Sequence, residues 1–119
     1  MAALTTTTLS TALGVVTATV NTASASDTFT YVPNSNQLLE MDNTTGGSLT
    51  LNVKGSAPSS AWTVPSTSTT VDLSTGLNIV VAAGTKKIVN LDKISAYLQG
   101  TGYVVTASGA ATLKITIYN

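Results

Sequence analysis

The stretch Ser48-Leu-Thr-Leu-Asn-Val-Lys54 alternates strictly between polar and apolar residues. Successive side chains of an extended chain point to opposite faces, so Leu49, Leu51 and Val53 share one face. This pattern predicts a strand with one face in a core and the other in water. The stretch Thr112–Tyr118 repeats the pattern. Its expected inward residues are Leu113, Ile115 and Ile117, and we expect Thr50, Lys114 and Thr116 to be exposed.

Weaker alternation extends this reading to most of the chain. The additional predicted strands cover residues 15–20, 28–31, 37–42, 69–73, 77–81, 87–91 and 103–107. Segments rich in Gly, Pro, Asn and Ser separate them and supply turns. Short strands at this spacing predict an all-β domain, an antiparallel β-sandwich. The exception is the segment 92–98, whose apolar spacing and leading Asp92 predict one short helical turn.

The first 25 residues differ from the rest because they are rich in threonine and alternate only weakly. Few apolar groups are present there to offset the entropy of ordering. We therefore expect an extended N-terminal arm at 1–25 and a β-sandwich domain at 26–119. Ala23–Asp27 resembles a small-residue cleavage site, but no Lys or Arg precedes Lys54. A secreted precursor is thus the lesser alternative to an uncleaved structural arm.

Composition narrows the possible functions. The chain has 119 residues, five lysines, five acidic residues, a net charge of zero, and neither His nor Cys. Arginine is absent as well. The balanced charge argues against nucleic acid or an anionic membrane as partner. The missing residue types include the usual general base, the thiolate nucleophile and the bidentate phosphate clamp. We therefore expect no catalytic residue, no bound metal and no cofactor.

The segment Val81–Leu91, VAAGTKKIVNL, is where cationic side chains concentrate. A phosphate-binding loop would need a second glycine at fixed spacing, Ser or Thr after the lysine, and a helix downstream. Here Ile88 follows Lys87, and a strand is expected instead. The segment predicts a β-hairpin with Gly84 in its turn. Lys86 and Lys87 would then point to opposite faces, and one of them would protect a sheet edge.

Other candidate chemistry is weak. Glu40 and Asp42 share one strand face and could bind a cation, although a solvated face is the favoured interpretation. Asn43-Thr-Thr45 matches a glycosylation sequon, yet it also lies in a natural turn. A nucleophilic Ser–Lys pair stays an open alternative, but with so many serines some will lie near a lysine by chance. Trp62 lies between two prolines. It is either a partner-binding anchor or a lid over one end of the sandwich.

Taken together, the segments resemble a family of small tailed-bacteriophage virion proteins, typically head decoration (cement) or neck accessory proteins. The resemblance rests on the Thr/Ala-rich start, the Gly-Gly turn into Leu49–Val53, and the ordered segments from Ile79 to the C-terminus. This sequence differs from the family pattern at two places. It has Ala82-Ala83 where the family often has proline, and it contains the Trp-containing segment 56–66. The resemblance implies an immunoglobulin-like β-sandwich and no enzymatic activity.

The resemblance also implies a function and partners. The chain is expected to bind the assembled phage capsid and stabilise it, with the major capsid protein and further copies of itself, as dimers or trimers, as partners. Its location would be the virion surface. Neck accessory protein and carbohydrate-binding or adhesin module are the alternatives. Residues expected to contact the partner are Leu4, Leu9, Leu13, Val15 and Trp62.

Overall fold

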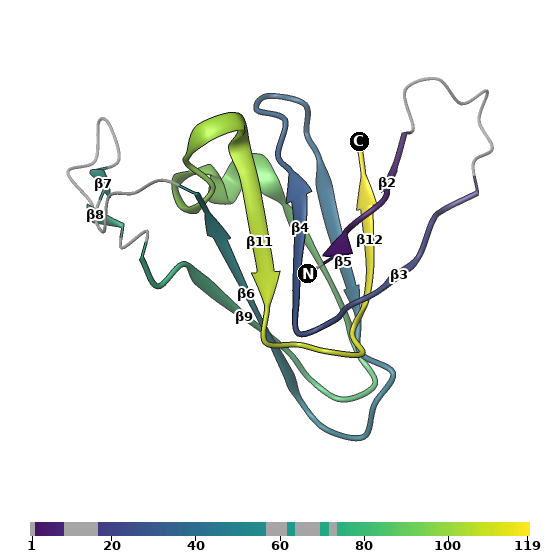
Figure 1. Ribbon diagram of the computed structural model, residues 1–119. Coiled ribbons are helices and arrows are strands. Elements are labelled where there is room, and N and C mark those ends of the chain that lie inside the picture. The colour runs from purple at the N-terminus through teal and green to yellow at the C-terminus, as the bar shows by residue number, and fades with distance from the viewer. Residues whose placement is uncertain (1, 9–16, 57–61, 64–69, 72–73) are drawn as a thin grey trace.

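The computed structural model describes residues 2–8, 17–56, 62–63, 70–71 and 74–119, and they form a mostly β structure with two main sheets (Figure 1). Sheet A has the order β1 (Ala2–Ala3), β4 (Ser26–Thr30), β11 (Val104–Ser108), β6 (Leu49–Gly55) and β9 (Leu77–Val81). Sheet B has the order β10 (Lys86–Asn90), β5 (Leu38–Asp42), β12 (Lys114–Tyr118) and β2 (Thr6–Thr7), and β3 (Asn21–Thr22) also pairs with β12. A separate pair joins β7 (Trp62–Thr63) to β8 (Thr70–Val71).

The chain changes sheet at nearly every connection. From β3 in sheet B it passes to β4 in sheet A, returns to β5 in sheet B, and crosses again to β6 in sheet A. Among the described strands of the two main sheets, β6 and β9 are the one successive pair that lies side by side, and they pair antiparallel. The resulting sheets, β4-β11-β6-β9 and β10-β5-β12-β3, have the connectivity of an eight-stranded jelly roll.

This connectivity does not confirm the immunoglobulin-like part of the expected fold. An immunoglobulin domain keeps its last two strands in one sheet. Here β11 lies in sheet A and β12 in sheet B. The antiparallel expectation holds for the eight main strands, but β1 pairs parallel to β4 and β2 pairs parallel to β12. Both parallel pairs involve the N-terminal segment, so the sheets are mixed at that edge.

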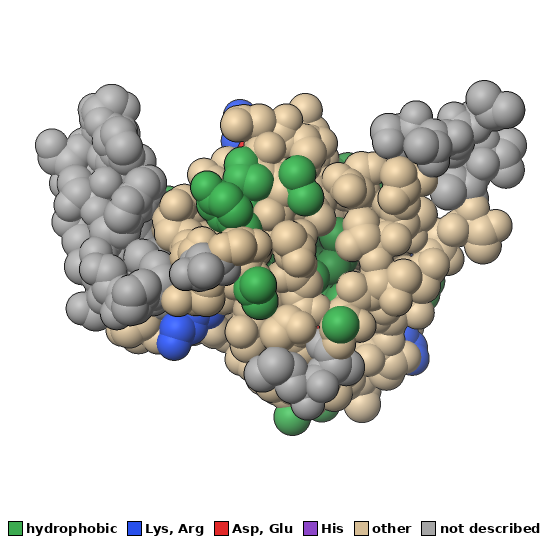
Figure 2. All heavy atoms as spheres, turned by 45° about the horizontal axis from the view of Figure 1, so that its top comes forward, with side chains coloured by type: hydrophobic (Ala, Val, Ile, Leu, Met, Phe, Trp, Pro, Cys, Tyr) green, Lys and Arg blue, Asp and Glu red, His purple; other side chains and the backbone are tan. Residues whose placement is uncertain are grey.

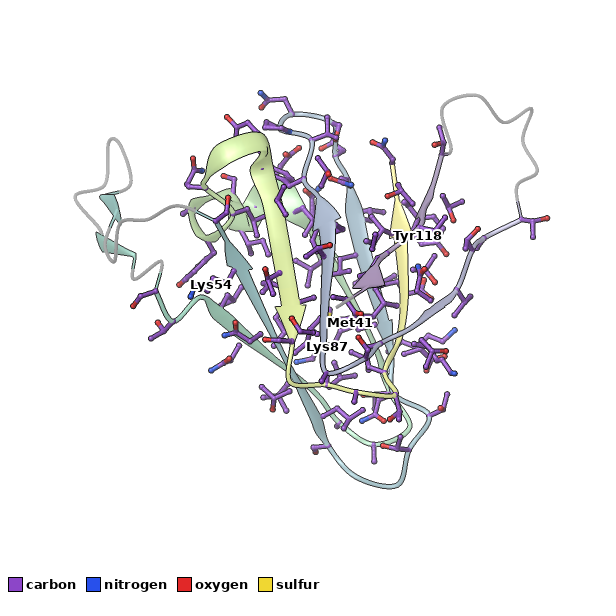
Figure 3. All side chains as sticks on the ribbon, in the orientation of Figure 1. Met41, Lys54, Lys87 and Tyr118 are labelled. Carbon is purple, nitrogen blue, oxygen red and sulfur yellow. The ribbon has the colours of Figure 1, made fainter. Side chains whose placement is uncertain are left out.

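One hydrophobic core joins the two sheets, and Met41 is labelled within it in Figure 3. Its fully covered members come from both sheets: Leu39, Met41, Ile115 and Ile117 from sheet B, and Leu51, Val53, Val81 and Val105 from sheet A. Leu113, just before β12, is fully covered as well, so five of the six inward positions predicted from alternation are confirmed. Leu49 is half-buried and packs against the core from the end of β6.

The predicted exposure of Thr116 on the outer face of its strand is wrong. It was expected to be exposed like Thr50, but it retains only 3% of its accessible surface. On the free side of β12, β3 pairs at Lys114 and Ile115, and β2 pairs at Ile117 and Tyr118. Thr116 thus stands between two N-terminal strands that cover it. Lys114, also expected to be exposed, is half-buried at the same edge.

The segment around Gly84 is a turn, but the predicted hairpin is wrong. Gly84 has a φ of 69°, and the Thr85 amide donates to the Ala82 carbonyl over 3.1 Å. The flanking strands do not pair with each other, because β9 pairs with β6 and β10 pairs with β5. The turn instead carries the chain from sheet A to sheet B. Lys87 lies opposite Met41 at the edge of sheet B and is exposed, as expected of an edge-protecting lysine (Figure 3).

Two further predictions concern local structure. The helical turn expected at 92–98 is present as the 3-10 segment η1 (Leu91–Tyr97), where the Asn90 side chain accepts from the Asp92 amide over 3.0 Å. A second 3-10 turn, η2 (Thr101–Tyr103), precedes β11. The strand expected at 15–20 is not found at residues 17–20, and residues 15–16 lie outside the described part.

We predict that Ile115→Ala lowers the free energy of unfolding by about 2–5 kcal/mol, because it leaves a cavity between two close-packed sheets. Urea denaturation followed by circular dichroism measures this loss. Thr50→Ala is the matched control on an exposed strand position and should change stability by less than about 0.5 kcal/mol. Equal effects of the two substitutions would contradict the assigned register.

Candidate interaction surface

An exposed apolar patch lies at the end of sheet A where β4 ends and β11 begins. It consists of Val32, Tyr103 and Val104, which are 41%, 40% and 40% exposed. Val104 lies opposite Thr30 in the β4–β11 ladder, and the Tyr31 amide donates to the Tyr103 carbonyl over 2.9 Å. Figure 2 views the molecule with this end turned forward and shows hydrophobic side chains at its surface. We call these three residues the apical patch.

Tyr31 and Asp92 hold the backbone next to the apical patch in place through hydrogen bonds. The Tyr31 ring meets the Tyr103 ring edge-on, with centroids 6.0 Å apart. The Tyr31 hydroxyl donates to Asp92 Oδ1 over 2.5 Å. The same carboxylate accepts the amides of Asn34 and Asn36 over 3.0 and 2.9 Å. Both asparagines have a positive φ, which Asn tolerates better than most residues, so Asp92 holds a tight loop next to Val32.

The side chain of Gln37 extends the β4 edge toward the patch. Its Oε1 accepts the Val32 amide over 2.9 Å, and its Nε2 donates to the Thr30 carbonyl over 3.1 Å. One amide side chain thus pairs with two backbone groups, as a neighbouring strand would. Gln37 is itself buried, and these two bonds give its amide the partners that a buried polar group requires.

The Tyr31–Asp92 pair shifts the pKa of both groups. The Tyr31 hydrogen bond, followed by the Asn36 amide, lowers the pKa of the Asp92 carboxyl below its usual range. Burial, followed by the hydrogen bond to Asp92, raises the pKa of Tyr31 to about 12. At neutral pH the pair is therefore a protonated phenol donating to a carboxylate.

The N-terminal residues are attached to the edges of both sheets. Beyond β1, the Leu4 amide donates to the Thr28 carbonyl over 2.8 Å, and the Leu4 side chain, 9% exposed, joins the core. The side chain of Asn21 pairs with both backbone groups of Thr5. Its Oδ1 accepts the Thr5 amide and its Nδ2 donates to the Thr5 carbonyl, each over 3.0 Å. Asn21 Nδ2 also lies 3.2 Å from the Ile115 carbonyl. In this structure the segment packs on its own domain.

The five residues predicted to contact a partner are not brought together in the described part. Leu4 packs into the core of its own chain, so its side chain is not available at the surface in this structure. Leu9, Leu13 and Val15 lie outside the described residues. The backbone of Trp62 pairs with Val71, and its side chain also lies outside the described part. Their contribution to partner binding stays a prediction.

Sequence reasoning missed the apical patch and the amide side chains that support it. A signal for Val104 was present, because alternation with Val105 places a valine on an otherwise polar face. Val32 and Tyr103 lie at strand ends, where alternation does not determine direction. Gln37 and Asn21 gave no signal, because each side chain pairs with backbone groups, and backbone partners leave no residue pattern in the sequence.

The acidic pair of β5 is half-buried on the outer face of sheet B. Asp42 lies opposite Lys86 and Lys114 on the two neighbouring strands, and the Lys86 ammonium is 3.9 Å from its carboxylate. Glu40 faces Ile88 and Thr116. Within the described residues, no three acidic side chains gather in a group that could hold a metal ion. The described helical segments are too short to cross a membrane.

In comparisons with known proteins, no family model, curated sequence or solved structure matches this chain.

We predict that stability falls below about pH 4 as Asp92 is protonated. Its pKa is lower in the folded chain, so its contribution is complete above the unfolded pKa and is lost as the pH falls through the folded value. Thermal unfolding of the wild type and Asp92→Asn between about pH 3 and pH 6 measures this. The variant should be less stable at pH 6 and should show a shallower decline in acid.

Tyr31→Phe is the matched control because it removes one donor and keeps the carboxylate. Its acid decline should lie between those of the wild type and Asp92→Asn. Identical slopes in all three proteins would show that Asp92 does not stabilise the loop electrostatically.

We also predict that a chain starting at Asp27 is destabilised by more than about 2 kcal/mol. The truncation removes β1, β2 and β3, together with the core residues Leu4 and Ala23. The sequence predicts an extended arm at 1–25 with few apolar groups, whereas the structure places Leu4 and Ala23 of this segment in the core. Leu4→Ala in the full chain should reproduce part of the loss. Unchanged melting of the truncated chain would show that residues 1–26 are dispensable for folding.

Proposed function

We propose that this chain is a structural protein of a tailed-phage virion that binds the assembled capsid and stabilises it. The sequence resemblance to decoration proteins supports this function, and the jelly-roll connectivity agrees with it by analogy, since viral capsid domains often use that architecture. The resemblance implied an immunoglobulin-like sandwich, and we propose that the jelly-roll arrangement takes its place in the same role.

The observation that carries the proposal is the apical patch. Its three residues are exposed, and they lie where the paired backbones of β4 and β11 meet at one end of sheet A. The Asp92 carboxylate and the Gln37 amide hold the backbone beneath them in place. A fixed apolar surface binds a partner at a low entropic cost, because little must be ordered on docking.

The low charge of the chain agrees with docking onto a large protein surface. Only 8% of residues are charged, and the net charge is zero. Long-range repulsion between many copies on one lattice is therefore weak. Assembly with itself as a dimer or trimer around a lattice axis is part of the proposal. Within the described residues β10 forms an outer edge of sheet B, and it offers further backbone groups for such contacts.

Co-sedimentation of the full chain with purified capsids that lack it tests the proposal. The wild type should pellet with the capsids, and Val104→Ser combined with Val32→Ser should weaken binding about tenfold or more, because two buried apolar side chains would be lost from the interface. Both residues are exposed, so folding should be kept.

Val80→Ser is the matched control. Val80 is 50% exposed on β9 and lies outside the apical patch. It should bind like the wild type. Absence of wild-type binding to capsids would overturn the function, and equal binding by all variants would overturn the assignment of the apical patch.

A further inference from the structure

The outer face of sheet A holds a polar hollow that capsid binding through the apical patch does not use. Its volume is about 640 Å³. Its lining includes the polar side chains of Asn52, Lys54, Ser74, Thr75, Thr106 and Ser108. In Figure 3, Lys54 projects from β6 on the side away from the core residue Met41. The hollow is thus built on a regular sheet surface.

The floor of the hollow is set by strand register. Lys54 lies opposite Thr106, and Asn52 lies opposite Ser108, in the antiparallel β6–β11 ladder. Paired side chains on one face of such a ladder are about 5 Å apart, and the next pair along the strand follows after about 7 Å. An ammonium, an amide and two hydroxyls therefore form a compact set on a rigid surface.

One wall of the hollow is held in place by hydrogen bonds and by a glycine. Asn52 Nδ2 donates to the Thr75 carbonyl over 2.7 Å and to Asn78 Oδ1 over 2.9 Å. Gly76 follows with a φ of 68°, and a Cβ there would lie 2.5 Å from the Val53 carbonyl oxygen. Only glycine allows the chain to approach β6 so closely. The wall is therefore formed before any ligand arrives.

Lys54 is the charged group of the hollow. Within the described part of the chain the one ion pair joins Lys86 to Asp42, and no described acidic residue lines the hollow. Neither the Lys54 ammonium nor the hydroxyls of Thr106 and Ser108 hydrogen-bond to another described residue. A positive charge thus lies beside two hydroxyl groups, those of Thr106 and Ser108, that still have hydrogen-bonding capacity.

We propose that this hollow binds a saccharide bearing an anionic group, a site independent of the capsid contact. Most ligand pockets are lined by apolar side chains, and a lining of Asn, Ser, Thr and Lys instead matches a ligand rich in hydroxyl groups. Lys54 matches a carboxylate or sulfate on that ligand. The volume lies within the usual range of small-molecule sites.

Titration of the ¹⁵N-labelled full chain followed by NMR tests this site. The probes are a disaccharide containing glucuronic acid, a neutral disaccharide of equal size, and inorganic phosphate. The acidic disaccharide should shift the amides of residues 52–56, 106 and 108 at millimolar concentration. Lys54→Gln should weaken it about tenfold or more, and Thr106→Val should weaken it less, because a bond to a charged group is the stronger one.

Lys87→Gln is the matched control, since it removes an exposed lysine from the edge of sheet B. It should bind like the wild type. Equal binding of the neutral disaccharide would show that Lys54 does not recognise an anionic group on the ligand. Equal binding of phosphate would show an anion site with no saccharide selectivity. Either result, or no shift with the acidic disaccharide, overturns the proposal.

Discussion

The structure depends on keeping backbone groups hydrogen-bonded where the chain crosses between its two sheets, and Asn43 is the residue that does this at one end. Its Nδ2 donates to the carbonyls of Gly47 and Val81, each over 2.8 Å, and its Oδ1 accepts the Thr45 amide. Its own backbone pairs with Gly84 and Thr85. The crossing from β5 to β6 and the crossing from β9 to β10 are thereby tied together. Because Asn43 is fully buried, its side-chain amide would otherwise be left without hydrogen-bond partners.

The same solution recurs elsewhere in the molecule. Gln37 pairs with the edge of β4, and Asn21 pairs with Thr5 in the N-terminal segment, each through both ends of its amide. In the described residues no buried polar side-chain atom lacks a hydrogen-bond partner. A chain with 8% charged residues thus relies on neutral amides and hydroxyls to specify its fold. This choice leaves few charges at the surface, which suits the proposed docking on a capsid.

The two proposed surfaces differ in chemistry because they lie on different parts of sheet A. The apical patch is formed at strand ends, where Val32 and Tyr103 leave the alternating pattern. The polar hollow is formed in the middle of the sheet, where alternation places Asn52 and Lys54 outward. An apolar contact for a protein and a polar site for a saccharide can thus coexist on one domain. The N-terminal segment completes sheet edges in this structure.

The sequence by itself determined which residues face the core, because a side-chain period of two requires only local geometry; Leu51, Val53, Ile115 and Ile117 were assigned correctly. It also determined the turn at Gly84 and the helical segment after Asn90. Only the tertiary structure decided which strands pair, since a strand such as β10 has the same alternation whichever sheet it joins. It likewise decided the burial of Thr116 and the apical patch, because these depend on segments far apart in the sequence, and loop closure over such distances leaves no local pattern.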